Sequence, residues 1–354
     1  MNKSRALDQL CRLLQGRSTP GADWAAVLEL ANRALVTPRL EGSLDAADAP
    51  ADVRTFVQDV ARRNEARNAR LFAQMGEAAV ALNAVGIVPM ALKGGACLAR
   101  DAGRCSRVLN DIDLVVTPDE IEVALQALRD AGFSLLSRRS GVALHAVAEL
   151  GRPQDVGPID LHQRPPGPPG FVSGDEILRA GKVWPVGAGQ VRAPEPHMHV
   201  YLQALHDQLH DGAYWRGGFD LRHAWDIADL IQGGDGVDWD RLYALPPTRL
   251  TTHVVEAQVM ACHRLTGAPI PAASRGVSAR VQYGRQRLQY VAPLLRAPLA
   301  ILAMLFETPN LVGHRAEDRR SRAAAGLPPR ENGLSKNGLA RLGLALQAAS
   351  DERL

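Results

Sequence analysis

Two aspartates separated by one residue are the first candidates for chemistry in this chain. They lie in the stretch Asn110 to Val116, which reads NDIDLVV. In a β-strand, residues i and i+2 point to the same face, so Asp111 and Asp113 would project together while Ile112 and Leu114 enter an apolar core. Neighbouring carboxylates repel each other unless a cation neutralises them, and a pair of Mg²⁺ ions about 3.5–4 Å apart is a common arrangement where phosphates are gripped. The spacing therefore favours a two-metal phosphate site over a solvated strand start, because aspartate is depleted in strands.

A glycine turn upstream supplies a second feature suited to phosphate. Residues 87–92 predict a buried strand and residues 96–100 a short helix, with Lys93, Gly94 and Gly95 between them. Glycine lets the backbone approach a phosphate closely, and the free N–H groups at a helix N-terminus attract anions. Lys93 would add a point charge for the same phosphates. The alternative is a plain turn with a solvated lysine.

A third acid is expected from the segment PIDLH at residues 158–162. Strand alternation places Asp160 and His162 on one face, opposite Ile159 and Leu161. A carboxylate here could ligate a metal or accept a proton from an attacking hydroxyl, and His162 could orient Asp160 or touch the substrate. The alternative is a satisfied polar pair at a sheet edge.

Taken together, these motifs resemble the nucleotidyltransferase superfamily typified by DNA polymerase beta, and more closely its uncharacterised bacterial branch of nucleotidyltransferase family proteins. That branch carries a Leu-Lys-Gly motif, an arginine shortly before Asp-Ile-Asp-Leu-Leu-Val, and an Asp-Leu-His motif. The matching segments here are Leu92-Lys93-Gly94, Arg107, Asp111 to Val116, Asp160-Leu161-His162, His206, Asp226, Asp238-Trp239 and residues 265–271. The resemblance covers about residues 75–275. The wider superfamily usually has Gly-Ser where this chain has Gly94-Gly95, so Lys93 would replace the missing hydroxyl.

The resemblance implies an enzyme that moves a nucleoside monophosphate from an NTP, ATP among the candidates, to a hydroxyl or phosphate of an acceptor. It also implies a cofactor of two Mg²⁺ ions. The implied catalytic residues and metal ligands are Asp111, Asp113 and Asp160. The implied nucleotide-binding residues are Lys93, Gly94, Gly95, Arg107 and His162. Arg107 could instead pair with Asp111.

Two other functions remain open at this stage. The first is a regulatory or antitoxin-like protein that binds nucleotide without turnover, against which the three acids argue. The second is a His-Asp metal phosphohydrolase, because His199, His206 and His210 fall on one face of a helix and two of them precede an aspartate. A hydrolase would lose activity on replacement of His206 rather than Asp111.

The overall composition indicates a soluble protein with one sizeable core. The 354 residues are 46% hydrophobic and 22% charged, and the net charge of +3 is far from that of a dedicated nucleic-acid coat. The arginines near the acids are scattered, so a small-molecule or peptide acceptor is expected and nucleic acid is not. The four cysteines are scattered and include no Cys-x-x-Cys pair. Neither a disulfide framework nor a zinc knuckle is therefore expected. No targeting signal is evident, and the apolar run 297–306 is too short to span a membrane, so a cytoplasmic protein is expected.

The pattern along the chain predicts an α/β (α+β) protein with a mixed β-sheet core, an N-terminal helical segment and a mainly helical C-terminal region. Four parts are expected: 1–85 helical, 86–193 catalytic core, 194–312 helical, and 313–354 a loosely ordered tail. Residues 52–82 predict one long amphipathic helix. The expected strands of the core are 87–92, 112–116, 133–137, 142–148 and 158–163, and its expected helices are 95–102 and 118–131. The expected C-terminal helices are 195–210, 219–232, 238–244, 248–266, 276–294 and 297–307, with a further one at 339–349.

Overall fold

The chain divides into two compact units in the computed structural model, which describes residues 3–138, 146–165, 167, 177–178 and 180–306. One unit spans Asp59–Leu202, and the other combines Met1–Gln58 with Gln203–Leu354. They are called here the sheet unit and the helical unit. The four-part division expected from the sequence stays a prediction, because these units group residues by contact rather than by position in the chain.

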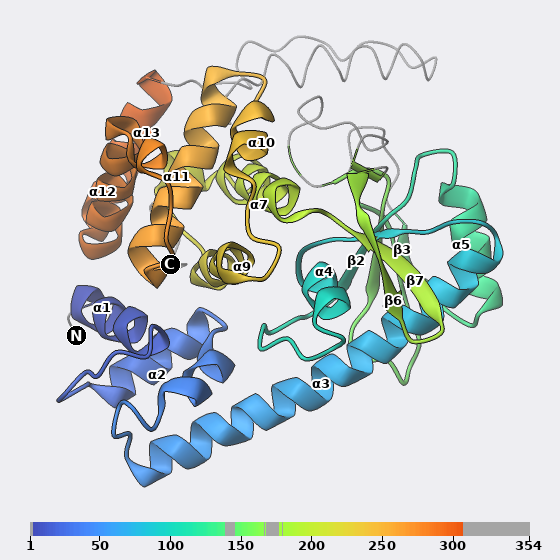
Figure 1. Cartoon of the computed structure of the whole chain (residues 1–354), viewed down its shortest axis with the longest axis horizontal. Coiled ribbons are helices and arrows are strands. Elements are labelled where there is room, and N and C mark those ends of the chain that lie inside the picture. Colours follow the sequence, from blue (N-terminus) through green and yellow to red (C-terminus); the bar gives the residue numbers. More distant parts are fainter. Residues whose placement is uncertain (1–2, 139–145, 166, 168–176, 179, 307–354) are drawn as a thin grey trace. The chain divides into compact units, whose positions relative to one another are not determined.

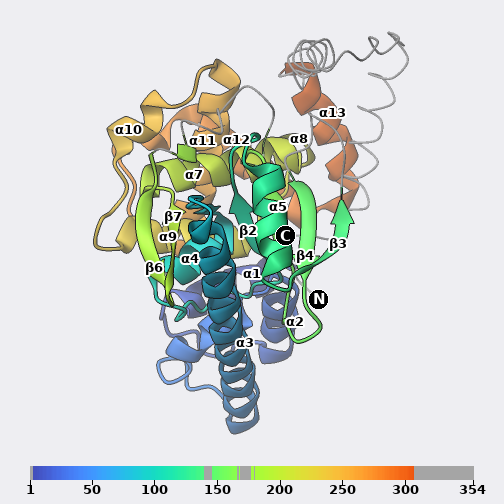
Figure 2. The ribbon, with the colours of Figure 1, turned by 90° about the vertical axis from the view of Figure 1, so that its right-hand side faces the viewer.

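The described part of the sheet unit is built on seven strands in the order β3-β4-β5-β2-β1-β7-β6. Figures 1 and 2 show β2, β3, β6 and β7 of this sheet from two directions. Their bounds are β1 Met90–Ala91, β2 Ile112–Val115, β3 Ser134–Arg138, β4 Ala146–Gly151, β5 Ile159–His162, β6 Lys182–Val186 and β7 Gly189–Ala193. β2 runs parallel to β5 and antiparallel to β1, so the sheet is mixed. The helices of this unit are α4 (Lys93–Arg100), α5 (Ile121–Asp130) and most of α3 (Ala51–Ala84), which begins in the helical unit.

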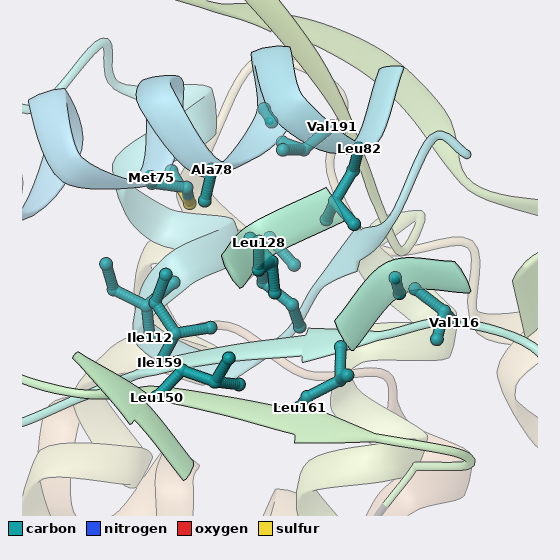
Figure 3. Packing of buried hydrophobic residues seen from close by; sticks show 14 of the residues in the cluster. Met75, Ala78, Leu82, Ile112, Val116, Leu128, Leu150, Ile159, Leu161 and Val191 are labelled. Carbon is teal, nitrogen blue, oxygen red and sulfur yellow. The ribbon is translucent and has the colours of Figure 1, made fainter. Parts of the chain in front are cut away.

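One apolar cluster joins the sheet to α3, α4 and α5 (Figure 3). Ile112 of β2 and Ile159 of β5 are fully buried in it, together with Met75 and Leu82 of α3 and Leu128 of α5. Because side chains alternate along a strand, burial of these residues turns the intervening ones to the opposite face of the sheet. The expected alternation of the two acid-bearing strands is confirmed.

The helical unit contains the two N-terminal helices and the later helices of the chain. Their bounds are α1 Lys3–Leu14, α2 Trp24–Arg33, α8 Ala213–Arg216, α9 Leu221–Gln232, α10 Trp239–Ala244, α11 Arg249–Thr266, α12 Val277–Val291 and α13 Arg296–Phe306. α7 (Pro196–Ala204) leads into this unit and continues as a π-helical turn, Leu205–His210. The 18-residue helix α11 has clear sequence boundaries: a capping box between Thr248 and Thr251, and Gly267 in the left-handed conformation (φ 77°).

The fold class expected from the sequence is confirmed, and most helices lie within a few residues of their expected positions. The expected strand 87–92 is limited to Met90–Ala91. The β6–β7 hairpin was not expected. The predicted helix 339–349, and residues 142–145 of a predicted strand, lie outside the described residues. No helix among the described residues is long and apolar enough to cross a membrane.

Candidate active site

The two central acids of the candidate site are brought together by strand register. Asp113 of β2 and Asp160 of β5 are direct partners in the parallel pair. They project from the face of the sheet opposite the apolar cluster. Asp113 is 3% exposed, whereas Asp160 is only partly buried. Two carboxylates from distant parts of the sequence therefore form one patch.

Asp113 is held by two basic side chains. Lys93 Nζ lies 2.9 Å and His162 Nε2 lies 3.0 Å from the same oxygen, Asp113 Oδ1. Burial opposes ionisation of Asp113, but the Lys93 ammonium and then His162 more than offset it and hold the pKa of this carboxyl well below its usual range. Asp113 is thus an ionised acid. From the sequence, His162 is expected to orient Asp160 or to touch the substrate. In the structure it is a direct partner of Asp113.

Asp160 is in a different electrostatic state. Burial, and then the negative charge of Asp113, raise the pKa of Asp160 above its ordinary value, while His162 opposes this shift. Asp111 contributes to the increase as well, so its carboxylate is close enough to act on Asp160. Two acids with opposite pKa shifts stand side by side, which is a common property of catalytic sites.

The donor atoms of this patch fit a divalent cation. Ligand atoms of Asp113, Asp160 and His162 all lie within 4.8 Å of one another. Carboxylate oxygens are the ligands that Mg²⁺ prefers. Asp111, expected from the sequence to share the metal, precedes β2 and is not in this group. The structure thus brings together two of the three predicted acids and adds His162 to them.

The two glycines lie inside helix α4 rather than in a turn before it. The helix begins at Lys93, a non-glycine residue with φ 46°, and both Gly94 and Gly95 are buried in its first turn. A Cβ atom on Gly94 would lie 2.5 Å from Leu109 Cδ2 and 3.1 Å from Arg107 Nε. Gly94 is therefore required by the side chains that cover it. The predicted helix start at residue 95 or 96 was wrong.

Substitution by alanine should affect the stability of the protein differently at Gly94 and at Gly95. Gly94→Ala should lower the free energy of unfolding by about 1–3 kcal/mol, because buried Leu109 and Arg107 must move to make room. Gly95→Ala is the matched control, since its Cβ would meet Ala91 Cβ at an ordinary 3.5 Å. It should be neutral or stabilising by up to about 1 kcal/mol, the gain of alanine over glycine in a helix. Urea unfolding of both variants measures this, and equal destabilisation would contradict the packing argument.

The segment between α4 and β2 carries Arg107 and Asp111, and it is tied down from two sides. Cys97 of α4 and Cys105 form a disulfide with Cα atoms 6.2 Å apart, which the scattered cysteines gave no reason to expect. On the other side, Asn68 Nδ2 of α3 donates to the carbonyls of Cys105 and Arg107, at 2.6 and 2.9 Å. These bonds make α3 a support for the site.

Other α3 side chains complete this support. Asn64 Nδ2 reaches the carbonyls of Ser106 and Arg107, and Arg67 Nε donates to the Leu109 carbonyl at 3.0 Å. These residues were not among those predicted to serve the site. One pattern in the sequence does point to them. Asn64 and Asn68 are four positions apart on α3, on a face of the helix whose other residues are apolar.

Comparison with known proteins agrees with this geometry. A family model described as an uncharacterised nucleotidyltransferase matches residues 20–266. No curated protein and no solved structure matches the chain. The matched region includes the whole acidic patch, α4 and the supporting part of α3, and it spans well over half of the chain. The chain therefore belongs to the uncharacterised nucleotidyltransferase family.

Proposed function

We propose that the protein transfers a nucleoside monophosphate from an NTP to a hydroxyl or phosphate group of a small-molecule or peptide acceptor, and releases pyrophosphate. The observation that carries this proposal is the pairing of Asp113 with Asp160 in one register position, beside Lys93 and the first turn of α4. Family membership supports the transfer of a nucleotidyl group in general. The acceptor and the two-metal mechanism are our own inference.

In this mechanism Asp113 and Asp160, with Asp111 at the edge of the patch, would hold two Mg²⁺ ions. Bound Mg²⁺ supplies neutralisation of the phosphate charge and polarisation of the phosphoryl oxygens. Carboxylates crowded on one strand pair fit this role, because their mutual repulsion favours cation binding. The depressed pKa of Asp113 keeps that ligand ionised.

The triphosphate is proposed to bind at the N-terminus of α4. The N–H groups in the first turn of a helix have no partner within the helix and attract anions. Lys93, Gly94 and Gly95 form that turn, and Lys93 adds its ammonium group. The ammonium lies on Asp113 and could reach both carboxylate and phosphate. Arg107, which packs over Gly94, is proposed as a further phosphate contact.

Asp160 is proposed to accept the proton of the attacking hydroxyl. Its partial exposure leaves it accessible to an acceptor, unlike Asp113.

Calorimetry with ATP, GTP, CTP and UTP, each with and without Mg²⁺, tests the proposal. At least one NTP should bind much more tightly with Mg²⁺, because the cation cancels the repulsion between phosphates and carboxylates. Asp119→Asn is a matched control, since Asp119 is exposed in the turn before α5, and it should bind as the parent does. Absence of Mg²⁺-dependent binding for all four nucleotides would refute the catalytic proposal.

A further inference from the structure

A second group of metal-type ligands lies in the helical unit, on the π-helical turn Leu205–His210 and just after it. His206 Nδ1 is 3.1 Å from Asp207 Oδ1 and 3.8 Å from Asp211 Oδ2. The three ligand atoms all lie within 4.8 Å of one another. They come from one short stretch of chain, and all belong to the helical unit.

The π-helical turn explains why these ligands converge. Asp211 N donates to the His206 carbonyl at 2.9 Å, the i to i+5 bond of a π-helix. In a regular α-helix residues five apart are rotated onto different faces, whereas the wider turn aligns them. Isolated π-helical turns are rare and often occur at functional sites. Of the three histidines expected on one helical face, His206 and His210 stack with their ring centroids 5.5 Å apart.

Asp207 is oriented by a buried hydrogen-bond network. Its Oδ1 accepts from Gln203 Nε2 at 3.0 Å and lies 2.9 Å from His223 Nδ1, while its Oδ2 accepts from Gln258 Nε2 at 2.9 Å. A carboxylate whose orientation is fixed by further polar groups is typical of metal ligands.

The three ligands open onto a cavity of about 220 Å³. Its other lining residues with ionisable side chains are Arg33, Arg216, Asp220, Arg222 and His223. Three aspartates and three arginines line the cavity, so their charges cancel before an ion binds. A divalent cation would make the cavity positive, and an oxyanion of phosphate size could then complete the coordination.

We propose that His206, Asp207 and Asp211 form a binding site for one divalent transition-metal ion, of the Zn²⁺ or Mn²⁺ class, which is separate from the nucleotidyl transfer site. One imidazole and two carboxylates match these ions better than Mg²⁺, which prefers oxygen alone. On binding, His206 uses its Nδ1 lone pair and carries its ring proton on Nε2. Three protein ligands leave a position open toward the cavity.

The test uses the full-length chain with Asp113→Asn and Asp160→Asn, so that the acidic patch of the sheet unit does not compete for metal. After removal of metal with a chelator, Zn²⁺ and Mn²⁺ are titrated separately by calorimetry. Co²⁺ serves as a third probe, because its visible absorption reports nitrogen and oxygen ligation. We expect one ion per chain for Zn²⁺ or Mn²⁺, and a Co²⁺ absorption band. Absence of binding by both Zn²⁺ and Mn²⁺ would refute the site.

Further substitutions in this background identify the ligands. His206→Ala and Asp211→Asn should each weaken metal binding at least about tenfold. His210→Ala is the matched control: its ring stacks on His206 with centroids 5.5 Å apart, but it does not line the cavity, so its affinity should stay within about twofold. Asp211→Asn guards against misfolding, since Asp211 is only partly buried and should retain the metal-free thermal midpoint. Unchanged affinity in Asp211→Asn, or equal loss in His210→Ala, would overturn the assignment.

Discussion

Asp113→Asn should reduce nucleotidyl transfer by at least about a thousandfold. A loss of about 4 kcal/mol of transition-state stabilisation gives this factor, and metal-assisted phosphoryl chemistry commonly depends on that much. The free energy of unfolding should fall by roughly 1–3 kcal/mol as well, because Lys93 and His162 both lose the charge of their shared partner. Pyrophosphate release measures the first effect, and urea unfolding without metal measures the second.

Asp160→Asn is the variant with which Asp113→Asn is compared, because the two substitutions should differ in their effect on stability. It should also abolish transfer, but its free energy of unfolding should be unchanged or higher, since the substitution removes a carboxylate that is repelled by Asp113. Equal destabilisation by the two substitutions would mean that both acids are structural. Residual transfer within about tenfold of the parent in either variant would contradict the proposed roles.

Ile112→Ala should have the largest effect on stability, lowering the free energy of unfolding by about 2–5 kcal/mol. Ile112 is fully buried between the strands and α3, and the alanine would leave a cavity there. Val123→Ala on α5 is the control, because Val123 is 49% exposed and should change stability by no more than about 0.5 kcal/mol. Urea unfolding of both variants decides, and a loss below 1 kcal/mol for Ile112→Ala would contradict the assigned core.

The acid-bearing strands could be predicted because their information is local. Alternation alone separates Ile112 and Leu114 from Asp113, and the same holds around Asp160. The β6–β7 hairpin also had a local signal, two short runs joined by Gly187-Ala188, but Pro185 obscured it. Proline is tolerated there because β6 is an edge strand.

Other parts of the site depend on contacts that no local pattern contains. Gly94 reads as a flexible turn until Leu109 and Arg107 are seen to cover it. The contact of the Lys93 ammonium with Asp113, 20 positions along the chain, likewise has no local signal. The π-helical turn that aligns His206 with Asp211 cannot be predicted from sequence periodicity, because the pattern is read with the 3.6-residue period of an α-helix.

The parallel pairing of β2 with β5 has a consequence for how the protein acquires its activity as it folds. Asp113 and His162 are 49 positions apart, and α5, β3 and β4 lie between their strands. Closing so long a loop lowers the chain entropy before the paired strands stabilise the protein. Parallel contacts of this kind therefore form slowly. A chain with its helices formed but β5 not yet docked has no acidic patch. During refolding, nucleotide binding should therefore recover later than the helical circular dichroism signal.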